Sequence, residues 1–251
     1  MMLEKYCIIN EIYRLSWFSK AMKVLVQKIK HHSRVVVTSL MIPMLLVAAF
    51  PIVEPLVASA IEDQFTIKQT ITAEISFQTP ATDIVMSGSL AGITGGTSNG
   101  GTQVNVLTNN ILGYTMTIKA SSSPAMQGDT QGGTIPDYTP ATTGVPDATF
   151  SVAANQAEFG YTFEASSTSD LALKFKDNGS GTCNTGSSDT ADTCWYSLST
   201  AATSTIVSSA ATAASGSTST IKFRLTINAN PSPAIPQDTY TATTTLTATT
   251  N

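Results

Sequence analysis

The segment "TIKFRLTI" (Thr220–Ile227) decides the fold class of this chain. Its apolar and polar side chains alternate: Ile221, Phe223, Leu225 and Ile227 stand between Lys222, Arg224 and Thr226. An amphipathic helix would repeat its apolar positions every third or fourth residue, whereas a period of two is typical of a strand with one buried face. We therefore expect this segment to be a β-strand.

The same alternation recurs in other segments of the chain. It is found in "QVNVLT" (103–108), "YTMTIKA" (114–120), "FGYTFEA" (159–165) and "TYTATTTLTAT" (239–249). The first two segments are joined by "NNILG", which predicts a hairpin with Val104 and Val106 on one face. Shorter candidate strands are Ile84–Met86, Thr149–Val152, Trp195–Leu198 and Thr205–Ser208. Residues 169–179 are open to two interpretations, a helical turn that begins at Ser169 or a strand.

Glycine, proline, serine and asparagine fill the segments between these candidate strands. Many short strands with turn residues between them predict an all-β protein, an antiparallel Ig-like β-sandwich. We expect one Ser/Thr-rich domain over 61–251, and the alternative is two small sandwiches divided within 124–147. From Ile61 onward, 61 of 191 residues are Ser or Thr, which suits half-exposed strands. The low-complexity stretch 208–220 is expected to be a hairpin tip or a linker.

The segment "FTIKQTITAEISF" (Phe65–Phe77) alternates over thirteen residues. A typical strand has about five or six residues, so this one is long for a single small sandwich. Two interpretations follow from its length. The segment crosses from one sheet to the other, or it adds to the exposed sheet edge of a neighbouring molecule.

Residues 1–60 carry the features of an export signal. A basic region with Lys23, Lys28, Lys30 and Arg34 precedes an almost wholly apolar stretch, 35–50, and Ala58-Ser59-Ala60 follows. These are the parts of a secretory signal peptide, and we predict cleavage after Ala60, with Ala58 and Ala60 as the small residues of the site. The alternative is an uncleaved membrane anchor. Residues 1–21 are an N-terminal extension before the more natural start at Met22.

Cysteine use agrees with export. The chain after Ala60 has two cysteines, Cys183 and Cys194, and they enclose a polar loop. An even number of cysteines in an exported chain predicts a disulfide. A metal pair is the alternative, although the spacing exceeds that of a zinc knuckle and the sequence offers no second pair.

Charge and histidine content narrow the possible chemistry. From Ile61 onward there are six basic and fourteen acidic residues, a net charge of −8, which is unfavourable for binding nucleic acid. Both histidines, His31 and His32, precede the predicted cleavage site, so the mature chain lacks His-dependent nucleophilic catalysis and His-based zinc sites. We therefore expect no enzyme activity, no cofactor and no metal site.

Two sets of carboxylates could in principle form a catalytic or metal site. Glu158 and Glu164 flank "FGYTF" on one strand face, where a solvated polar face is favoured over a glycosidase pair. Asp177, Asn178, Asp189 and Asp192 could offer oxygen ligands to calcium, but they do not follow the EF-hand pattern.

Trp195 and Tyr196 are the local feature that most suggests a ligand site. One interpretation is an aromatic stacking platform for a sugar beside the disulfide. The other is that neighbouring strand residues point to opposite faces, so that one ring lies in the core and one at the surface.

The C-terminal segment "PSPAIPQDTYTATTTLTATTN" (231–251) resembles the closing strand of WxL-type cell-wall-binding proteins and, more loosely, of spore-coat-U-like and fimbrial subunits. The resemblance is carried by Asp238, Tyr240, Thr241, Ala242 and Leu246. The Trp of the WxL motif is absent, and Thr244 or Thr245 stands in its place. "TNNILGYTMTI" (108–118) is similar to an early hairpin of such exported modules. The resemblance implies a bacterial envelope protein.

Together these features predict a protein that is secreted or held at the bacterial cell surface. The first expectation is a non-catalytic structural or adhesive module, including a self-assembling one. The alternative is a module that binds a glycan or a protein. The expected partners are a cell-envelope component, a glycan or a second copy, and membrane contact is expected only through an uncleaved leader.

Overall fold

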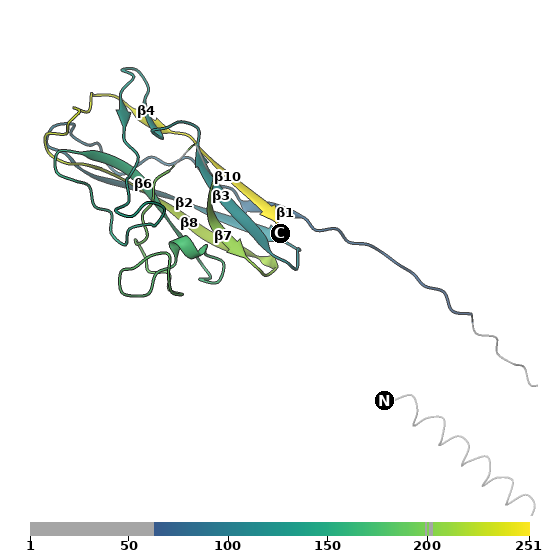
Figure 1. The fold of residues 1–251 in the computed structure, drawn as a ribbon. Coiled ribbons are helices and arrows are strands. Elements are labelled where there is room, and N and C mark those ends of the chain that lie inside the picture. The colour runs from purple at the N-terminus through teal and green to yellow at the C-terminus, as the bar shows by residue number, and fades with distance from the viewer. Residues whose placement is uncertain (1–62, 199, 201–202) are drawn as a thin grey trace, which may run out of the picture. The chain divides into compact units, whose positions relative to one another are not determined.

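The computed structural model describes residues 63–198, 200 and 203–251. Within these residues the chain is mostly β-structure in antiparallel sheets, and the only helical element is a single 3₁₀ turn, η1 (Leu173–Phe175). Gln69–Asn251 form one compact unit. Figure 1 shows the course of the chain through the sheets.

The larger sheet has four strands in the order β1 (Ile75–Thr79), β2 (Gly96–Thr108), β8 (Ala213–Ile227) and β6 (Ala157–Ala165). Every neighbouring pair is antiparallel. The predicted strand 220–227 is confirmed as the C-terminal half of β8, which lies between β2 and β6. Its apolar residues point to the core and its polar residues to the other face, as the alternation predicts.

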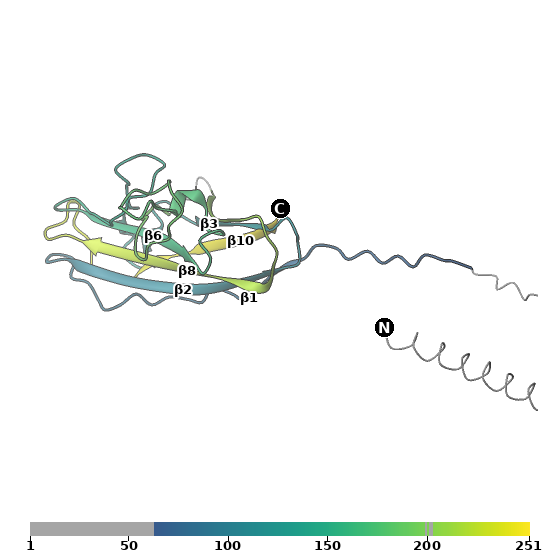
Figure 2. The same cartoon turned by 90° about the horizontal axis from the view of Figure 1, so that it is seen from below.

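The second sheet has three strands in the order β10 (Thr244–Thr250), β3 (Tyr114–Ala120) and β7 (Ser204–Ser209). β3 and β10 lie above β2 and β8 in the view of Figure 2. A third, small sheet consists of β5 (Thr134–Ile135), β4 (Met126–Gly128) and β9 (Tyr240–Ala242).

Buried residues from both larger sheets form one hydrophobic cluster. It includes Val104 and Val106 of β2, Met116 and Ile118 of β3, Tyr161 and Phe163 of β6, Val207 of β7, and Ile221 and Phe223 of β8. The inward positions predicted for residues 104–106 and 114–118 are therefore confirmed. The cluster contains residues from before and after 124–147.

The predicted hairpin between 103–108 and 114–120 is wrong. Both segments are strands, but β2 and β3 belong to different sheets and do not pair with each other. Gly113 adopts a φ of +82° between them, and a Cβ there would lie 2.1 Å from the carbonyl oxygen of Ser209. This close passage takes the chain across to the second sheet, which the turn residues alone did not indicate.

The predicted strand 65–77 is much shorter than expected. Only its last three residues belong to β1, and no secondary structure is assigned to residues 63–74. β1 pairs with residues 105–108 of β2, where β2 ends, so residues 63–74 have no partner strand within the part of the chain that the structure describes. Within the described residues, Phe65–Ile71 therefore do not cross from one sheet to the other and do not pair with a strand.

Other expectations are also corrected. The stretch 208–220 is neither hairpin tip nor linker, because most of it belongs to β8 and pairs with β2. The segment 239–249 is divided at Thr243 into β9 and β10, which lie in different sheets. Ile84–Met86 and Thr149–Val152 are not strands, and Trp195–Leu198 forms only isolated bridges at Trp195 and Tyr196. Thr205–Ser208 is confirmed within β7, and residues 169–179 contain the turn η1.

The predicted leader, residues 1–60 with Ala58 and Ala60, lies outside the described residues. Among the residues that are described, no helix has the length and apolar character needed to cross a membrane.

Candidate functional site

A shallow groove of about 720 Å³ lies on the outer face of the four-stranded sheet. Its floor is formed by residues 99–103 of β2 and 220–224 of β8, with Asp192 and Trp195 on one side. The polar side of the β8 alternation therefore faces this groove. The glycine at 101 leaves the middle of the floor without a side chain, so the backbone is accessible there.

Arg224 lies with Asn99 at one end of the groove floor. It lies opposite Asn99 in the register of β2 and β8, and its Nε donates a hydrogen bond of 2.8 Å to Asn99 Oδ1. Its guanidinium carbon lies 4.3 Å from the centre of the Trp195 ring. The hydrogen bond and the stacking hold the planar guanidinium at a fixed orientation, and guanidinium groups present several donors in one plane.

Lys222 lies opposite Gly101 in the middle of the groove floor and makes two ion pairs. Its Nζ lies 2.6 Å from Glu164 Oε1 and 3.1 Å from Asp192 Oδ1. Partial burial would lower the pKa of Lys222, but the hydrogen bonds from its ammonium group to Glu164 and Asp192 outweigh burial and raise that pKa. The ammonium group is therefore charged at neutral pH and links β8 to β6 and to the disulfide loop.

An aromatic layer covers the neighbouring part of the same sheet face. Tyr138 stacks on Phe150 at 4.4 Å between ring centres, and Phe150 meets Trp195 edge-on at 5.2 Å. These rings lie over Gly160 of β6, where a Cβ would be 2.7 Å from Tyr138 Cβ and 2.9 Å from Phe150 Cε2. The glycine thus allows the loops to pack onto β6, and the edge of this layer forms the wall of the groove.

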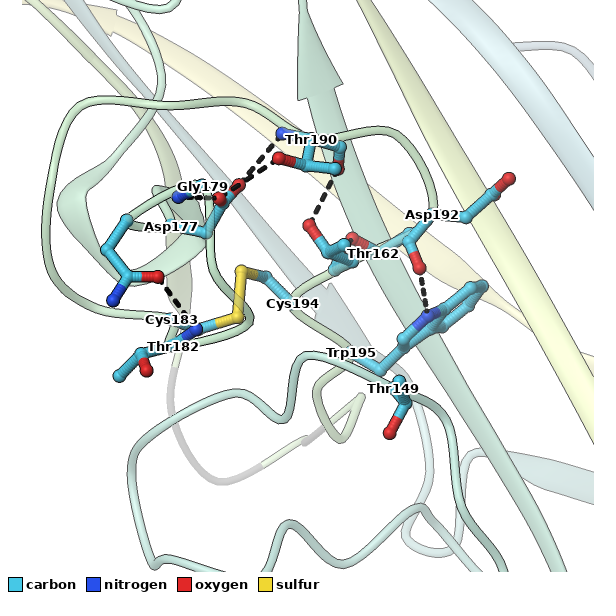
Figure 3. Close-up of a disulfide and its surroundings, with 12 residues drawn as sticks. Thr149, Thr162, Asp177, Gly179, Thr182, Cys183, Thr190, Asp192, Cys194 and Trp195 are labelled. Carbon is cyan, nitrogen blue, oxygen red and sulfur yellow. Dashed lines mark hydrogen bonds between the residues drawn. A yellow bond between two sulfur atoms is a disulfide. The ribbon is translucent and has the colours of Figure 1, made fainter.

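The predicted disulfide between Cys183 and Cys194 is present in the structure. Both cysteines are buried, and Figure 3 shows the bridge next to Trp195 and Asp177. The Trp195 indole Nε1 donates to the carbonyl oxygen of Asp192 at 2.9 Å, which fixes the ring relative to the loop. The disulfide loop therefore supports the wall of the groove.

Asp177 organises the interior of that loop. Its side chain is buried, and it accepts hydrogen bonds from Gly179 N at 2.6 Å, Thr190 N at 2.8 Å and Thr190 Oγ1 at 3.0 Å. Burial alone would raise the pKa of Asp177, but these hydrogen bonds to its charged form outweigh burial and lower it. The carboxylate thus holds the loop in place while charged.

The structure does not bring the proposed calcium ligands together. Asp177 is occupied by loop hydrogen bonds, Asp189 accepts from Ala165 N, and Asp192 pairs with Lys222. Residues 63–198, 200 and 203–251 contain no group of three or more side chains that could hold a metal ion.

Glu158 and Glu164 occupy opposite ends of β6. They are six residues apart, which corresponds to about 20 Å along a strand. Burial raises the pKa of Glu158, and hydrogen bonds from Thr139 partly offset that effect. Glu164 pairs with Lys222, so the two carboxylates take part in separate interactions.

Trp195 and Tyr196 contact different sets of residues. Trp195 is 1% exposed and lies between Phe150 and Arg224, so its ring has no open face for a sugar. Tyr196 is half-buried, meets Phe175 edge-on at 6.5 Å, and has Lys174 Nζ 4.2 Å from its ring centre. Trp195 can therefore contribute to binding only indirectly, by holding the Arg224 guanidinium in position.

The residues that carry the C-terminal resemblance have clear structural partners. Asp238 accepts hydrogen bonds from Gln131 N at 2.7 Å and Thr130 Oγ1 at 2.7 Å. The hydrogen bonds from the Gln131 and Thr130 backbone and the Thr130 hydroxyl lower the pKa of Asp238 to about 2. Tyr240 OH donates to the Pro236 carbonyl oxygen at 2.9 Å. These contacts fix the turn between β4 and β5.

Sequence reasoning identified the disulfide and Trp195 but missed the groove. Its polar side chains come from Asn99 and Gln103 on β2 and from Lys222 and Arg224 on β8, over 100 residues apart in the chain. The alternation predicts that Asn99 and Gln103 share one face of β2 and that Lys222 and Arg224 share one face of β8. It does not predict that β2 and β8 pair side by side, and this pairing brings the four side chains together. The arrangement offers amide, hydroxyl and guanidinium groups to a polar ligand.

No family model, curated protein sequence or solved structure matches this chain. Its function must therefore be inferred from its own residues and their geometry.

Proposed function

We propose that this protein is an exported, non-catalytic β-module of the bacterial cell surface with a structural or adhesive role. In this proposal residues 1–60 act as extension and signal peptide, and residues 61–251 form a sandwich of the Ig-like class. The two antiparallel sheets that share one core support the sandwich assignment. Its partners are then a cell-envelope component, a glycan or a second copy, and not nucleic acid.

The Cys183–Cys194 disulfide is the observation that carries the proposal. Disulfides form and persist in oxidising compartments outside the cytosol. Here both cysteines are buried beside Trp195, so export and correct folding of the loop that they close are coupled. The low charge and the abundant hydroxyl groups from Ile61 onward agree with a stable surface module.

The first prediction tests export. When the full gene is expressed in an exporting bacterium, the product recovered from the envelope or medium should begin at Ile61. Ala60→Lys should block processing because the site requires a small residue there, whereas Ser59→Ala should not. N-terminal sequencing and non-reducing mass spectrometry are the measurements. A cytosolic product with its leader retained and its thiols free would contradict the proposal.

The groove supports a second candidate function, glycan binding. Planar amide and guanidinium groups match the hydroxyl groups of sugars, and Arg224 is held in place by Asn99 and Trp195. A groove on a sheet face can accommodate an extended chain of sugar units. This function is compatible with an adhesive role of the same module.

The second prediction tests the groove. On a glycan array, any binding by the mature protein should fall roughly tenfold in Gln103→Ala, because one lost hydrogen bond to a ligand is worth about 1 kcal/mol or more. Gln131→Ala is the matched control, because Gln131 is exposed and lies outside the groove. Binding that survives Gln103→Ala and Arg224→Ala together would place the glycan site elsewhere.

A further inference from the structure

β10 is an edge strand with an incompletely covered inner face. Among the strands of the described residues it pairs only with β3, and its inward-facing residues Thr244, Leu246 and Ala248 are half-buried rather than buried. β1 ends at Thr79 and is followed by Pro80, which cannot continue a hydrogen-bonded ladder. A groove of about 210 Å³ remains between the two strands.

That groove, called the β1–β10 seam here, is lined mainly by apolar groups: Phe77, Pro80, Ala81, Thr244 and Leu246. The free backbone edge of β10 runs beside it. An edge strand with unpaired N–H and C=O groups can pair with another strand. The seam therefore has both features that a strand-binding site needs, a backbone edge and an apolar pocket.

The segment Phe65–Ile71 has the complementary properties. Phe65, Ile67 and Ile71 repeat at a period of two, and they are 81%, 83% and 83% exposed. No strand is assigned to them, although the alternation is that of a strand with one buried face. Three large apolar side chains on one face of a solvent-exposed segment indicate a surface that is covered in an assembly.

Hydrogen bonds fix Thr72–Glu74 to the residues at the end of β2. Asn109 accepts from Glu74 N at 2.7 Å and donates to the Thr72 carbonyl oxygen at 3.0 Å. Thr108 Oγ1 donates to the Glu74 carbonyl oxygen at 2.7 Å. These contacts hold the chain in the extended course that leads into β1, and no turn is assigned in 63–74.

We propose that Phe65–Ile71 of one molecule adds as an antiparallel strand to the free edge of β10 in a second copy. The segment and β10 are both seven residues long, so one strand can match the other over its whole length. The side chains of Phe65 and Ile67 enter the β1–β10 seam. Each copy then donates one strand and accepts one, and such a head-to-tail contact builds open chains unless the rotation between copies closes a ring. This inference rests on the proposed structural role and gives it a mechanism.

The test uses the full gene in an exporting host, with the secreted product purified and studied by sedimentation velocity. The unaltered protein is expected to show a concentration-dependent series of oligomers, with a weight-average mass roughly twofold or more above one copy. Phe65→Asp/Ile67→Asp should be monomeric, because a charge cannot enter the apolar seam. Thr66→Asp/Thr70→Asp is the matched control with the same charge change on the opposite strand face, and it should still assemble.

A synthetic Gln64–Thr72 peptide provides an independent measurement. It should bind the monomeric Phe65→Asp/Ile67→Asp protein, whose β10 edge is intact, and a peptide with the same two substitutions should bind at least about tenfold more weakly. A strictly monomeric unaltered protein, or a Phe65→Asp/Ile67→Asp variant that still assembles, would overturn the inference. An exported, disulfide-bonded monomer would leave the proposed function standing, so the two failures are distinguishable.

Discussion

At the scale of single residues, Asp177 shows how a buried charge can stabilise a loop. Its carboxylate is removed from water but accepts three hydrogen bonds, two of them from backbone N–H groups. Charge-assisted hydrogen bonds are stronger than neutral ones, and leaving their donors unpaired in a buried site is costly. The loop between the two cysteines therefore depends on Asp177 as well as on the disulfide.

Asp177→Asn should lower the free energy of unfolding by about 2 kcal/mol, because the amide loses the charge and turns donors toward Thr190 N or Gly179 N. Denaturant unfolding of the oxidised protein is the measurement. Asp129→Asn is the control, since Asp129 is exposed, and it should change stability by less than about 0.5 kcal/mol. Equal stability of the two variants would show that the Asp177 carboxylate does not stabilise the loop.

The effect of Asp177→Asn should depend on pH. The pKa of Asp177 is lowered in the folded protein, so its contribution to stability is fully present above the unfolded pKa of about 3.9. That contribution is lost as the pH falls through the lower folded pKa. The stability difference between the unaltered protein and Asp177→Asn should therefore be constant at neutral pH and shrink below about pH 4. A difference that grew on acidification would contradict the direction of this shift.

At the scale of elements, β6 is a strand covered on both faces. Its inner face carries Tyr161 and Phe163, and its outer face carries the loops with Tyr138, Phe150 and Trp195. The outer packing requires Gly160, because any side chain there would occupy the position of the Tyr138 and Phe150 atoms. The wall of the larger groove thus depends on one glycine in the middle of a strand.

Gly160→Ala should destabilise the protein by about 2 kcal/mol, because overpacking forces the neighbouring rings and backbone to shift. Gly101→Ala is the control on β2, on the same face of the sheet, where the residue is exposed and the nearest heavy atom to a Cβ would be 3.1 Å away. Thermal unfolding compares the two variants. If Gly160→Ala proves as stable as Gly101→Ala, the loops do not pack tightly on β6.

Sequence periodicity predicted the strands better than their partners. The alternation of residues 220–227 predicted the buried face of β8 correctly, because one side chain in two leaves water there. In residues 159–165 it predicted the core-facing residues Phe159, Tyr161 and Phe163 but not the burial of Gly160 and Thr162 on the other face. It failed for residues 65–74, because a periodic pattern does not reveal whether a partner strand is within reach. The stretch 208–220 was misjudged because its small residues look like a linker, yet Ser217 and Ser219 are buried in β8.

Some features of the candidate site could likewise be predicted from the sequence and others could not. The disulfide followed from the count and spacing of the cysteines, and the prominence of Trp195 followed from its type and place. The pairing of Arg224 with Asn99 could not be predicted, since it depends on the register between strands distant in the chain. Long-range register is specified by packing over the whole sheet and not by local pattern.

At the scale of the whole molecule, two apolar layers meet on the four-stranded sheet. The main cluster lies between the two larger sheets, and the smaller aromatic layer lies on the outer face of β6. Backbone hydrogen bonds join the outer loops to β6: Tyr138 N to Phe159 O at 2.7 Å, and Tyr196 N to Tyr161 O at 2.8 Å. At the larger groove and at the β1–β10 seam this packing leaves room for a partner.

The final prediction concerns cooperativity. Residues from before and after 124–147 share the main cluster, and the outer loops are bonded to β6, so residues 69–251 should unfold in one transition. Trp195, the only tryptophan after Ala60, reports on the outer layer, and far-ultraviolet circular dichroism reports on the sheets. In the mature, oxidised Phe65→Asp/Ile67→Asp protein, which excludes assembly, the two signals should change at the same denaturant concentration. Two separate midpoints would instead mean that the aromatic layer, or one of two small sandwiches, unfolds independently. The larger groove could then unfold while the sheets stay folded.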